Sequence, residues 1–332
     1  MTETLLNVEG LKTYFFTEAG VVKAVDGITF KIQKGETLGL VGESGSGKTV
    51  TALSVLRIIP KPGQIVAGKI EFNGEDLLTK TDKEMQELRG KNLSIIFQDP
   101  SSSLNPVFNV ETQIKDVILQ HQKISKEEAR KKVIELLDMV GIPEGEARMH
   151  EYPHQFSGGM KQRVAIARAI ACTPTLLFAD EPTTNLDVTI QAQVLDLLND
   201  LKKNFGMSLV MITHDMGVIA EMTSRIVVIY AGRVCEIAKT YELFEDPRHP
   251  YTEALLAAVP RLDMRKTLRV IPGNIPNLIN PPTGCRFHPR CQYAKQICYE
   301  KIAPLESIES GRFVACHEWQ NIVLKGEKDS DK

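Results

Sequence analysis

A glycine-rich segment near residue 45 constrains the fold of this chain more than any other part of its sequence. Residues 42–49 read Gly-Glu-Ser-Gly-Ser-Gly-Lys-Thr, and they lie between the apolar run 37–41 and the segment 50–56. A strand, a glycine loop and a helix in this order fit the phosphate-binding pattern G-x-x-x-x-G-K-[ST]. Glycines let successive backbone N–H groups turn toward an anion, and the helix start adds its positive dipole end. The segment therefore predicts an α/β fold of the P-loop NTPase type.

The residue types in this loop predict how it would hold ATP and Mg²⁺. Lys48 is expected to reach the β and γ phosphates, and the Thr49 hydroxyl is expected to ligate Mg²⁺. Upstream, Tyr14 or Phe15 could stack on a purine ring, and the alternative is that both belong to a strand core. The expected ATP contacts in the loop are Gly42, Glu43, Ser44, Gly45, Ser46, Gly47, Lys48, Thr49 and Val50.

Length and charge narrow the class of protein. The chain has 332 residues, which suggests two domains, and its formal net charge of −2 provides no global basic field for nucleic acid or anionic lipid. Neither a secretory leader nor an apolar run of about 18 residues is seen, so we expect a cytosolic location. Six cysteines, four of them in the last fifty residues, indicate a metal site more than a set of disulfides.

Residues 5–35 are expected to form separate strands at 5–8, 13–16 and 28–32, and 68–74 a hairpin element, so this first region is mostly antiparallel. Strands and helices alternate later in the manner of a parallel sheet. Residues 101–150 are charged and helical in pattern. A Ser-Gly-Gly sequence then begins another helix and forms a second potential anion site. Its members are Ser157, Gly158 and Gly159.

Three apolar runs end in polar residues, at the strand ends where parallel sheets hold ligands. Gln98 follows the run 93–97, and it is either a turn residue or a ligand of Mg²⁺ or water. Asp180 and Glu181 follow 175–179, and we expect Asp180 in the outer shell of the metal and Glu181 beside an attacking water. His214 follows 208–213, on the expected γ-phosphate side.

The order and spacing of these motifs over residues 1–240 resemble the nucleotide-binding subunits of ATP-binding-cassette (ABC) transporters. The resemblance implies a helical subdomain at about 100–172, an adenine stack on Phe15 or Tyr14, and a Gln98 that senses Mg²⁺ and touches a membrane subunit. It also implies that Ser157 to Gly159 bind the ATP of a partner cassette, that Asp187 of Asn185-Leu186-Asp187 lies at the dimer seam, and that His214 contacts the γ-phosphate. The signature reads Phe-Ser-Gly-Gly-Met instead of Leu-Ser-Gly-Gly-Gln, which leaves the Ser-Gly-Gly site intact.

Residues 241–332 form a C-terminal extension beyond a minimal cassette. A His-Pro-Tyr-Thr element at 249–252 precedes a proline-rich stretch and four cysteines, which together resemble the di- and oligopeptide importer branch; a nickel importer is the alternative. The cysteines are expected to hold one metal centre, and their long intervals and the resemblance favour a [4Fe–4S] cluster over Zn²⁺. In the zinc alternative, His288 or His317 could replace a ligand. The four cysteines are Cys285, Cys291, Cys298 and Cys316.

The expected function is therefore ATP hydrolysis that powers import, most simply of dipeptides or oligopeptides. The chain would act in a homodimer or heterodimer with a second ABC ATPase, on the cytoplasmic face of the membrane. Its other partners would be two permease subunits and, indirectly, an extracytoplasmic peptide-binding protein. Two rival classes are a soluble cassette ATPase acting on DNA or the ribosome, and an iron–sulfur redox carrier. The first would more often show a coiled-coil insertion or a basic stripe, and the second does not explain the ATP motifs.

Overall fold

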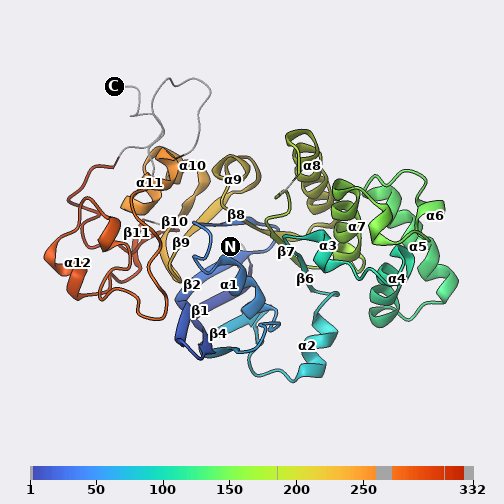
Figure 1. The fold of residues 1–332 in the computed structure, drawn as a ribbon, viewed down its shortest axis with the longest axis horizontal. Coiled ribbons are helices and arrows are strands. Elements are labelled where there is room, and N and C mark those ends of the chain that lie inside the picture. Colours follow the sequence, from blue (N-terminus) through green and yellow to red (C-terminus); the bar gives the residue numbers. More distant parts are fainter. Residues whose placement is uncertain (1–2, 185, 259–270, 310, 325–332) are drawn as a thin grey trace. The chain divides into compact units, whose positions relative to one another are not determined.

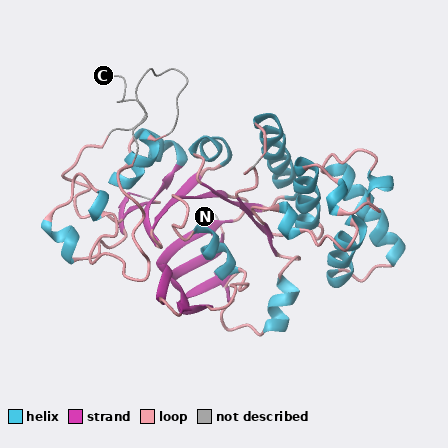
Figure 2. Ribbon diagram, in the orientation of Figure 1, coloured by secondary structure: helices cyan, strands magenta, loops and turns pink. Residues whose placement is uncertain are grey.

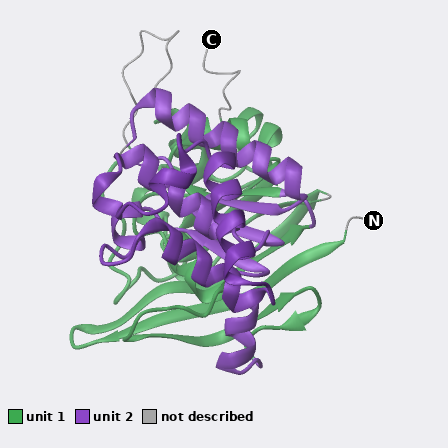
Figure 3. Cartoon of the chain, turned by 90° about the vertical axis from the view of Figure 1, so that its right-hand side faces the viewer, with its two compact units in different colours: residues 1–33, 37–78, 212–332 green, residues 34–36, 79–211 purple. Residues whose placement is uncertain are grey.

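The computed structural model describes residues 3–184, 186–258, 271–309 and 311–324, which fall into two compact units (Figure 3). Unit 1 comprises residues 1–33, 37–78 and 212–332, and unit 2 comprises residues 34–36 and 79–211. The C-terminal extension therefore belongs to the same compact unit as the glycine loop. A domain boundary at residue 240 stays a prediction.

Unit 1 contains most of the strands (Figure 1). Its strands are β1 (Thr4–Thr17), β2 (Gly20–Gln33), β3 (Thr37–Val41), β4 (Gly63–Phe72), β5 (Glu75–Asp76), β9 (Arg225–Tyr230), β10 (Arg233–Lys239), β11 (Glu306–Glu309) and β12 (Arg312–Val314). Its helices are α1 (Lys48–Val55), α9 (Met216–Met222), α10 (Thr240–Glu245), α11 (Pro250–Ala257), the short 3₁₀ helix η2 (His288–Arg290) and α12 (Gln296–Glu300).

Unit 2 is mostly helical (Figure 2). Its helices are α2 (Asp82–Leu88), α3 (Pro100–Ser103), α4 (Val110–His121), α5 (Lys126–Met139), α6 (Gly145–Arg148), η1 (Pro153–Gln155), α7 (Gly158–Ile170) and α8 (Val188–Phe205). Its strands are β6 (Leu93–Ile96), β7 (Leu176–Asp180) and most of β8 (Ser208–Thr213).

The N-terminal strands form the expected antiparallel sheet, in the order β2-β1-β4-β5. The sequence suggested separate strands at 5–8 and 13–16, and this detail is wrong because both runs belong to β1. The register of β1 against β2 shifts between Val8 and Leu11, around Gly10 at φ +56°. A bulge at a glycine bends a strand without ending it, so the strand continues where a break was expected.

The remaining strands of unit 1 are ordered β11-β12-β10-β9-β3. β3 and β9 pair in parallel, whereas β9 and β10 pair antiparallel. All five residues of β3 are buried, as a parallel strand covered on both faces requires. α9 packs against β3, and α10 packs against β9 and β10. The carboxyl end of β3 leads directly into the glycine loop.

In unit 2 the strands are ordered β8-β7-β6, and β6 and β7 pair in parallel. The helices α3 to α7 cover residues 100–170 and pack mainly on one another. The helical pattern of residues 101–150 is confirmed, and α5 begins with a complete capping box between Ser125 and Glu128. The α/β architecture therefore contains both the antiparallel sheet and the helical region that the sequence indicated.

Candidate functional site

The glycine loop joins β3 to α1, and two of its glycines cannot be replaced without strain. Gly42 has φ +152°, and a Cβ there would lie 2.1 Å from the carbonyl oxygen of Ile229. Gly47 has φ +104°, and a Cβ there would lie 2.4 Å from the carbonyl oxygen of Ala24. Only glycine fits such positions. The spacing seen in the sequence therefore reflects the close approach of the loop to neighbouring backbone.

Lys48 closes the loop on itself. Its buried ammonium donates hydrogen bonds to the carbonyl oxygens of Gly42, at 2.7 Å, and Glu43, at 2.9 Å. Ser44, Gly45 and Thr49 are exposed. A lysine held at the centre of a loop whose tip is open to solvent is well placed to meet an incoming anion.

The two aromatic candidates of β1 have different surroundings. The Tyr14 hydroxyl donates to Asp26, with the two oxygens 2.7 Å apart, and burial together with that carboxylate raises the pKa of Tyr14 to about 12. The neighbouring Thr13 hydroxyl is 2.7 Å from that of Ser54 in α1. Side chains alternate along a strand, so Phe15 shares the side of Thr13, next to the helix that follows the glycine loop. This arrangement leaves Phe15 as the candidate for a ring stack.

The C-terminal extension contacts the glycine loop at Glu43. The backbone N–H of Glu43 donates to the Tyr251 hydroxyl, at 2.8 Å. The Glu43 carboxylate accepts two hydrogen bonds from Arg290, at 2.7 and 3.0 Å. Burial raises the pKa of Tyr251, so its hydroxyl keeps its proton at physiological pH. Two residues that lie more than 200 positions downstream thus hold one residue of the loop.

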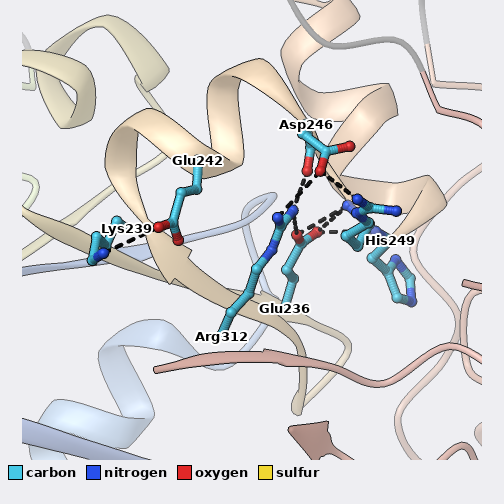
Figure 4. Close-up of polar contacts among 7 residues, drawn as sticks. Glu236, Lys239, Glu242, Asp246, His249 and Arg312 are labelled. Atoms are coloured by element: carbon cyan, nitrogen blue, oxygen red, sulfur yellow. Dashed lines mark hydrogen bonds and ion pairs between the residues drawn. The ribbon is translucent and has the colours of Figure 1, made fainter. Parts of the chain in front are cut away.

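A buried carboxylate fixes the start of the helix that carries Tyr251 (Figure 4). Glu236 of β10 accepts the backbone N–H groups of Arg248 and His249, both at 2.9 Å, and pairs with Arg312 at 3.4 Å. Arg312 also pairs with Asp246. Burial raises the pKa of Glu236, although these donors oppose the shift. The His-Pro-Tyr-Thr element is therefore anchored to the sheet of unit 1.

In unit 2 the structure brings Gln98 and Glu181 together. The Gln98 side-chain amide donates to the Glu181 carboxylate at 2.9 Å, and the Thr184 hydroxyl donates to the same oxygen at 2.9 Å. Glu181 has φ +45°, a strained conformation for a residue other than glycine and one that is frequent at functional sites. Asp180, the last residue of β7, is buried. A carboxylate held by two donors can orient a water molecule.

The second glycine motif begins a helix as the sequence predicted. Ser157 is the N-cap of α7, and its hydroxyl accepts the backbone N–H of Met160 at 3.3 Å. Asp187 likewise caps α8 by accepting the N–H of Ile190 at 3.0 Å. Asn185 of the same motif lies outside the described residues. Both capping residues are exposed, so two helix N-termini of unit 2 are open to a partner.

The compact units divide the predicted site residues. The glycine loop belongs to unit 1 together with His214, which is exposed after β8. The residues of unit 2 are Gln98, Ser157, Gly158, Gly159, Asp180, Glu181 and Asp187.

The four cysteines of the extension line one small cavity. The N–H of Cys285 donates to the carbonyl oxygen of Cys298 at 2.8 Å. Burial raises the pKa of Cys291 to about 11 and that of Cys316 to about 12. His288 and His317 also border the cavity. However, a ring N–H of His288 donates a hydrogen bond to the carbonyl oxygen of Cys285, and one of His317 donates to that of Lys301. Within the described part of the chain, no three His, Cys, Asp or Glu side chains are arranged to hold a single metal ion.

Comparison with known proteins decides the family. A family model described as "ABC transporter" matches residues 25–184, and a model described as "Oligopeptide/dipeptide transporter, C-terminal region" matches residues 235–298. The oligopeptide transport ATP-binding protein OppD of Bacillus subtilis is 50% identical over 313 residues, which cover 93% of this chain and 87% of OppD. The chain belongs to the ABC transporter ATPases of this oligopeptide and dipeptide branch.

Other relatives extend the comparison of this ABC ATPase. The dipeptide transport ATP-binding protein DppD of Escherichia coli is 47% identical over 314 residues, which cover 94% of the chain and 96% of DppD. The dimeric structure of the cassette MJ0796 bound to ADP and Pi matches with a TM-score of 0.64 and 26% identity, over 71% of this chain and 98% of that one. The ATPase fold, and the resemblance on which the sequence analysis relied, are thereby confirmed. No described helix of this ABC ATPase has the length and apolar character that crossing a bilayer requires.

Sequence reasoning on this ABC ATPase missed the contacts of Arg290, Tyr251 and Asp26. Arg290 lies between Cys285 and Cys291, and Tyr251 lies in the His-Pro-Tyr-Thr element. Both segments have recognisable motifs, but the motifs predict no role for these two side chains. Asp26 pairs with Arg286 at 2.6 Å and with Arg233 at 2.8 Å. Burial raises the pKa of Asp26, but the Tyr14 hydroxyl and the two guanidiniums outweigh burial and lower it overall. Local sequence patterns cannot predict contacts between segments that are so far apart in the sequence.

Proposed function

We propose that this ABC ATPase hydrolyses ATP to power the import of dipeptides or oligopeptides. The observation that carries the proposal is the joint presence of the glycine loop, with its buried Lys48, and a C-terminal region that matches the peptide transporter branch.

The glycine loop is proposed to bind the phosphates of ATP. Its backbone N–H groups and the α1 N-terminus favour an anion, and Lys48 would exchange its two carbonyl partners for the β and γ phosphates. Thr49 and Gln98 offer the oxygen ligands that Mg²⁺ prefers, and Asp180 would lie in the outer shell of the metal. Phe15 is the proposed adenine stack, since the Tyr14 hydroxyl is bound to Asp26.

Hydrolysis is proposed to proceed by in-line attack of a water molecule that Glu181 orients. The strained backbone of Glu181 and its two donors fix the carboxylate in one direction. His214 would contact the γ-phosphate, and Lys48 would stabilise charge on the transferring phosphoryl group.

We propose that a second cassette completes each ATP site. Ser157, Gly158 and Gly159 form an exposed helix N-terminus suited to the γ-phosphate of a partner's ATP, and Asp187 would lie at the seam between cassettes. The proposed assembly contains a second ABC ATPase, identical or different, and two permease subunits on the cytoplasmic face of a membrane. An extracytoplasmic peptide-binding protein would deliver the cargo.

Substrate stimulation of ATP hydrolysis tests the proposal. The chain should be assembled with its second cassette and permeases in lipid nanodiscs, with the binding protein added. We expect weak ATPase activity in the isolated chain, and strong stimulation of the assembly by di- or oligopeptides. Stimulation by Ni²⁺ alone would assign the nickel alternative, and full ligand-independent activity of an isolated monomer would contradict the transporter role.

A [4Fe–4S] cluster held by Cys285, Cys291, Cys298 and Cys316 is the proposed metal centre of the extension. The four cysteines line one cavity, and within the described residues no three His, Cys, Asp or Glu side chains form a group that could hold a metal ion. Each cysteine of such a cluster binds a different iron, so its sulfurs stand farther apart than four ligands of one Zn²⁺. Four cysteine thiolates can bind either group, and the long intervals between the cysteines together with the resemblance favour the cluster over Zn²⁺. When bound, the cluster would supply cross-links that order the segment.

Replacing Cys298 by Ser should remove this cluster. Anaerobically purified protein should be brown and contain iron and acid-labile sulfide in equal amounts, and Cys298→Ser should bleach it and make residues after about 270 sensitive to protease. Cys172→Ser is the matched control, because Cys172 is a buried cysteine of unit 2 that does not line the cavity. Colourless wild-type protein with one equivalent of zinc would contradict the cluster.

A further inference from the structure

Every nitrogen of the Arg290 guanidinium donates a hydrogen bond, and two of these bonds go to Glu43 of the glycine loop. Besides its two bonds to Glu43, it donates to the carbonyl oxygens of Pro272, at 2.7 Å, and Ile271, at 3.3 Å, and to the Tyr230 hydroxyl, at 3.3 Å. The Arg290 side chain is 4% exposed, whereas that of Glu43 is 27% exposed. Planar, two-point pairs of this kind are both strong and geometrically specific. Arg290 is thus held by backbone carbonyls of the extension and by Tyr230 of β9, and it presents two N–H groups to Glu43.

Glu43 is held at three of its polar groups. Its N–H is bound to Tyr251, its carboxylate to Arg290 and its carbonyl oxygen to Lys48. Tyr251 itself packs in an aromatic cluster, with ring centroids 4.6 Å from Tyr230 and 5.3 Å from Phe287. The second residue of the loop therefore has little freedom as long as the extension is folded.

The extension also braces the turn against which the other end of the loop rests. The N–H of Gly232 donates to the carbonyl oxygen of Ser46 at 2.8 Å. Arg286 donates to the carbonyl oxygen of the preceding Ala231 and to Asp26. Arg286 and Arg290 come from one short segment of the extension, and they act on opposite ends of the glycine loop.

The positive charge of Arg290 also affects the electrostatics of the glycine loop, in addition to holding Glu43 in place. A carboxylate at the second position of a phosphate-binding loop repels a triphosphate, and the repulsion is strong where water is partly excluded. The Arg290 guanidinium offsets that charge at a distance of 2.7 Å. Burial alone would lower the pKa of Arg290, but its bonds to Glu43 and Tyr230 raise it, so the guanidinium stays charged.

We propose that Arg290 and Tyr251 are positioning residues of the ATP site: they hold Glu43 in place, and Arg290 neutralises it, so that the C-terminal extension is required for tight ATP binding. The inference rests on the proposed ATP binding by the glycine loop. It assigns to the extension a direct part in nucleotide affinity, through residues that do not touch the nucleotide.

The test is the affinity of the full chain for Mg-ATP, measured with a fluorescent ATP analogue, together with the unfolding temperature without nucleotide. Arg290→Met should weaken ATP binding by about tenfold or more, because it leaves Glu43 uncompensated, and Arg290→Lys should recover part of the loss. Arg248→Met is the matched control: it removes a partly exposed arginine of the extension whose side chain pairs with Asp246 instead of the loop. Its ATP affinity should stay near that of wild type.

The decisive variant adds Glu43→Gln to Arg290→Met. Removing the unpaired charge should restore much of the ATP affinity, and raising the salt concentration should reduce the defect of the single variant. Tyr251→Phe should weaken binding several-fold, with Tyr293→Phe as its control, since the Tyr293 hydroxyl contacts Glu253. If Arg290→Met fails to fold, Arg290→Gln leaves the Glu43 carboxylate equally uncompensated while its amide can still donate hydrogen bonds in the same position, and ATP binding should again weaken.

Two outcomes would overturn the proposal. If Arg290→Met binds ATP with wild-type affinity but unfolds at a lower temperature, the Arg290–Glu43 pair only stabilises the fold. The same conclusion follows if the double variant binds ATP no better than Arg290→Met. A wild-type chain that does not bind ATP would instead refute the proposed function itself, which separates the two failures.

Discussion

Glu181→Gln is expected to lower the ATPase rate of the assembled transporter by at least about 10²-fold, the usual effect of losing a catalytic base. The amide keeps the size of the carboxylate and can still accept hydrogen bonds from Gln98 and Thr184, so the local structure should survive. What is lost is the negative charge that orients and polarises water. ATP affinity should be retained, and ATP should accumulate in a closed pair of cassettes.

The rate of phosphate release and the amount of bound ATP should both be measured for this variant. Glu146→Gln is a suitable control, because the Glu146 side chain is 73% exposed on α6 of the same unit. Near-wild-type hydrolysis by Glu181→Gln would remove Glu181 from the proposed role.

Lys48→Met is expected to weaken ATP binding by about 10- to 10²-fold. Hydrogen bonds to charged groups contribute about 1.5–3 kcal/mol each, and Lys48 is the only cation inside the sequence of the loop. Methionine keeps the aliphatic stem in the buried position but cannot bind phosphate. Equilibrium binding of Mg-ATP to the full chain gives the measurement.

Loss of the lysine also removes its bonds to Gly42 and Glu43, so the unfolding temperature must be recorded in parallel. Lys239→Ala serves as the control, because Lys239 is 68% exposed and pairs with Glu242 at the surface. Unchanged ATP affinity in Lys48→Met would contradict phosphate binding by this loop.

The parts of the site that the sequence predicted depend on local patterns. The strand, glycine loop and helix around Lys48 are contiguous, so residue spacing alone defines them. Gln98 and Glu181 could also be anticipated, since each follows a buried strand and β6 and β7 pair in parallel. Sequence patterns carry such information because strand ends of a parallel sheet share one edge.

The parts that the sequence did not predict depend on long-range contacts. Arg290 and Glu43 are separated by 247 positions, and nothing in a short window links them. The choice between Tyr14 and Phe15 likewise needed the partner of Tyr14, Asp26, whose position depends on strand register. The continuous β1 was missed because Gly10 can either end a strand or form a bulge in it.

ATP-driven uptake of labelled peptide into proteoliposomes that contain the complete transporter tests most directly whether this ATPase powers peptide import. ATP should be supplied on the side of this chain, and the binding protein and peptide on the other. We expect peptide accumulation that requires ATP hydrolysis and disappears with Glu181→Gln. Peptide accumulation that continues unchanged with Glu181→Gln, or rapid ATP hydrolysis without any peptide movement, would contradict it.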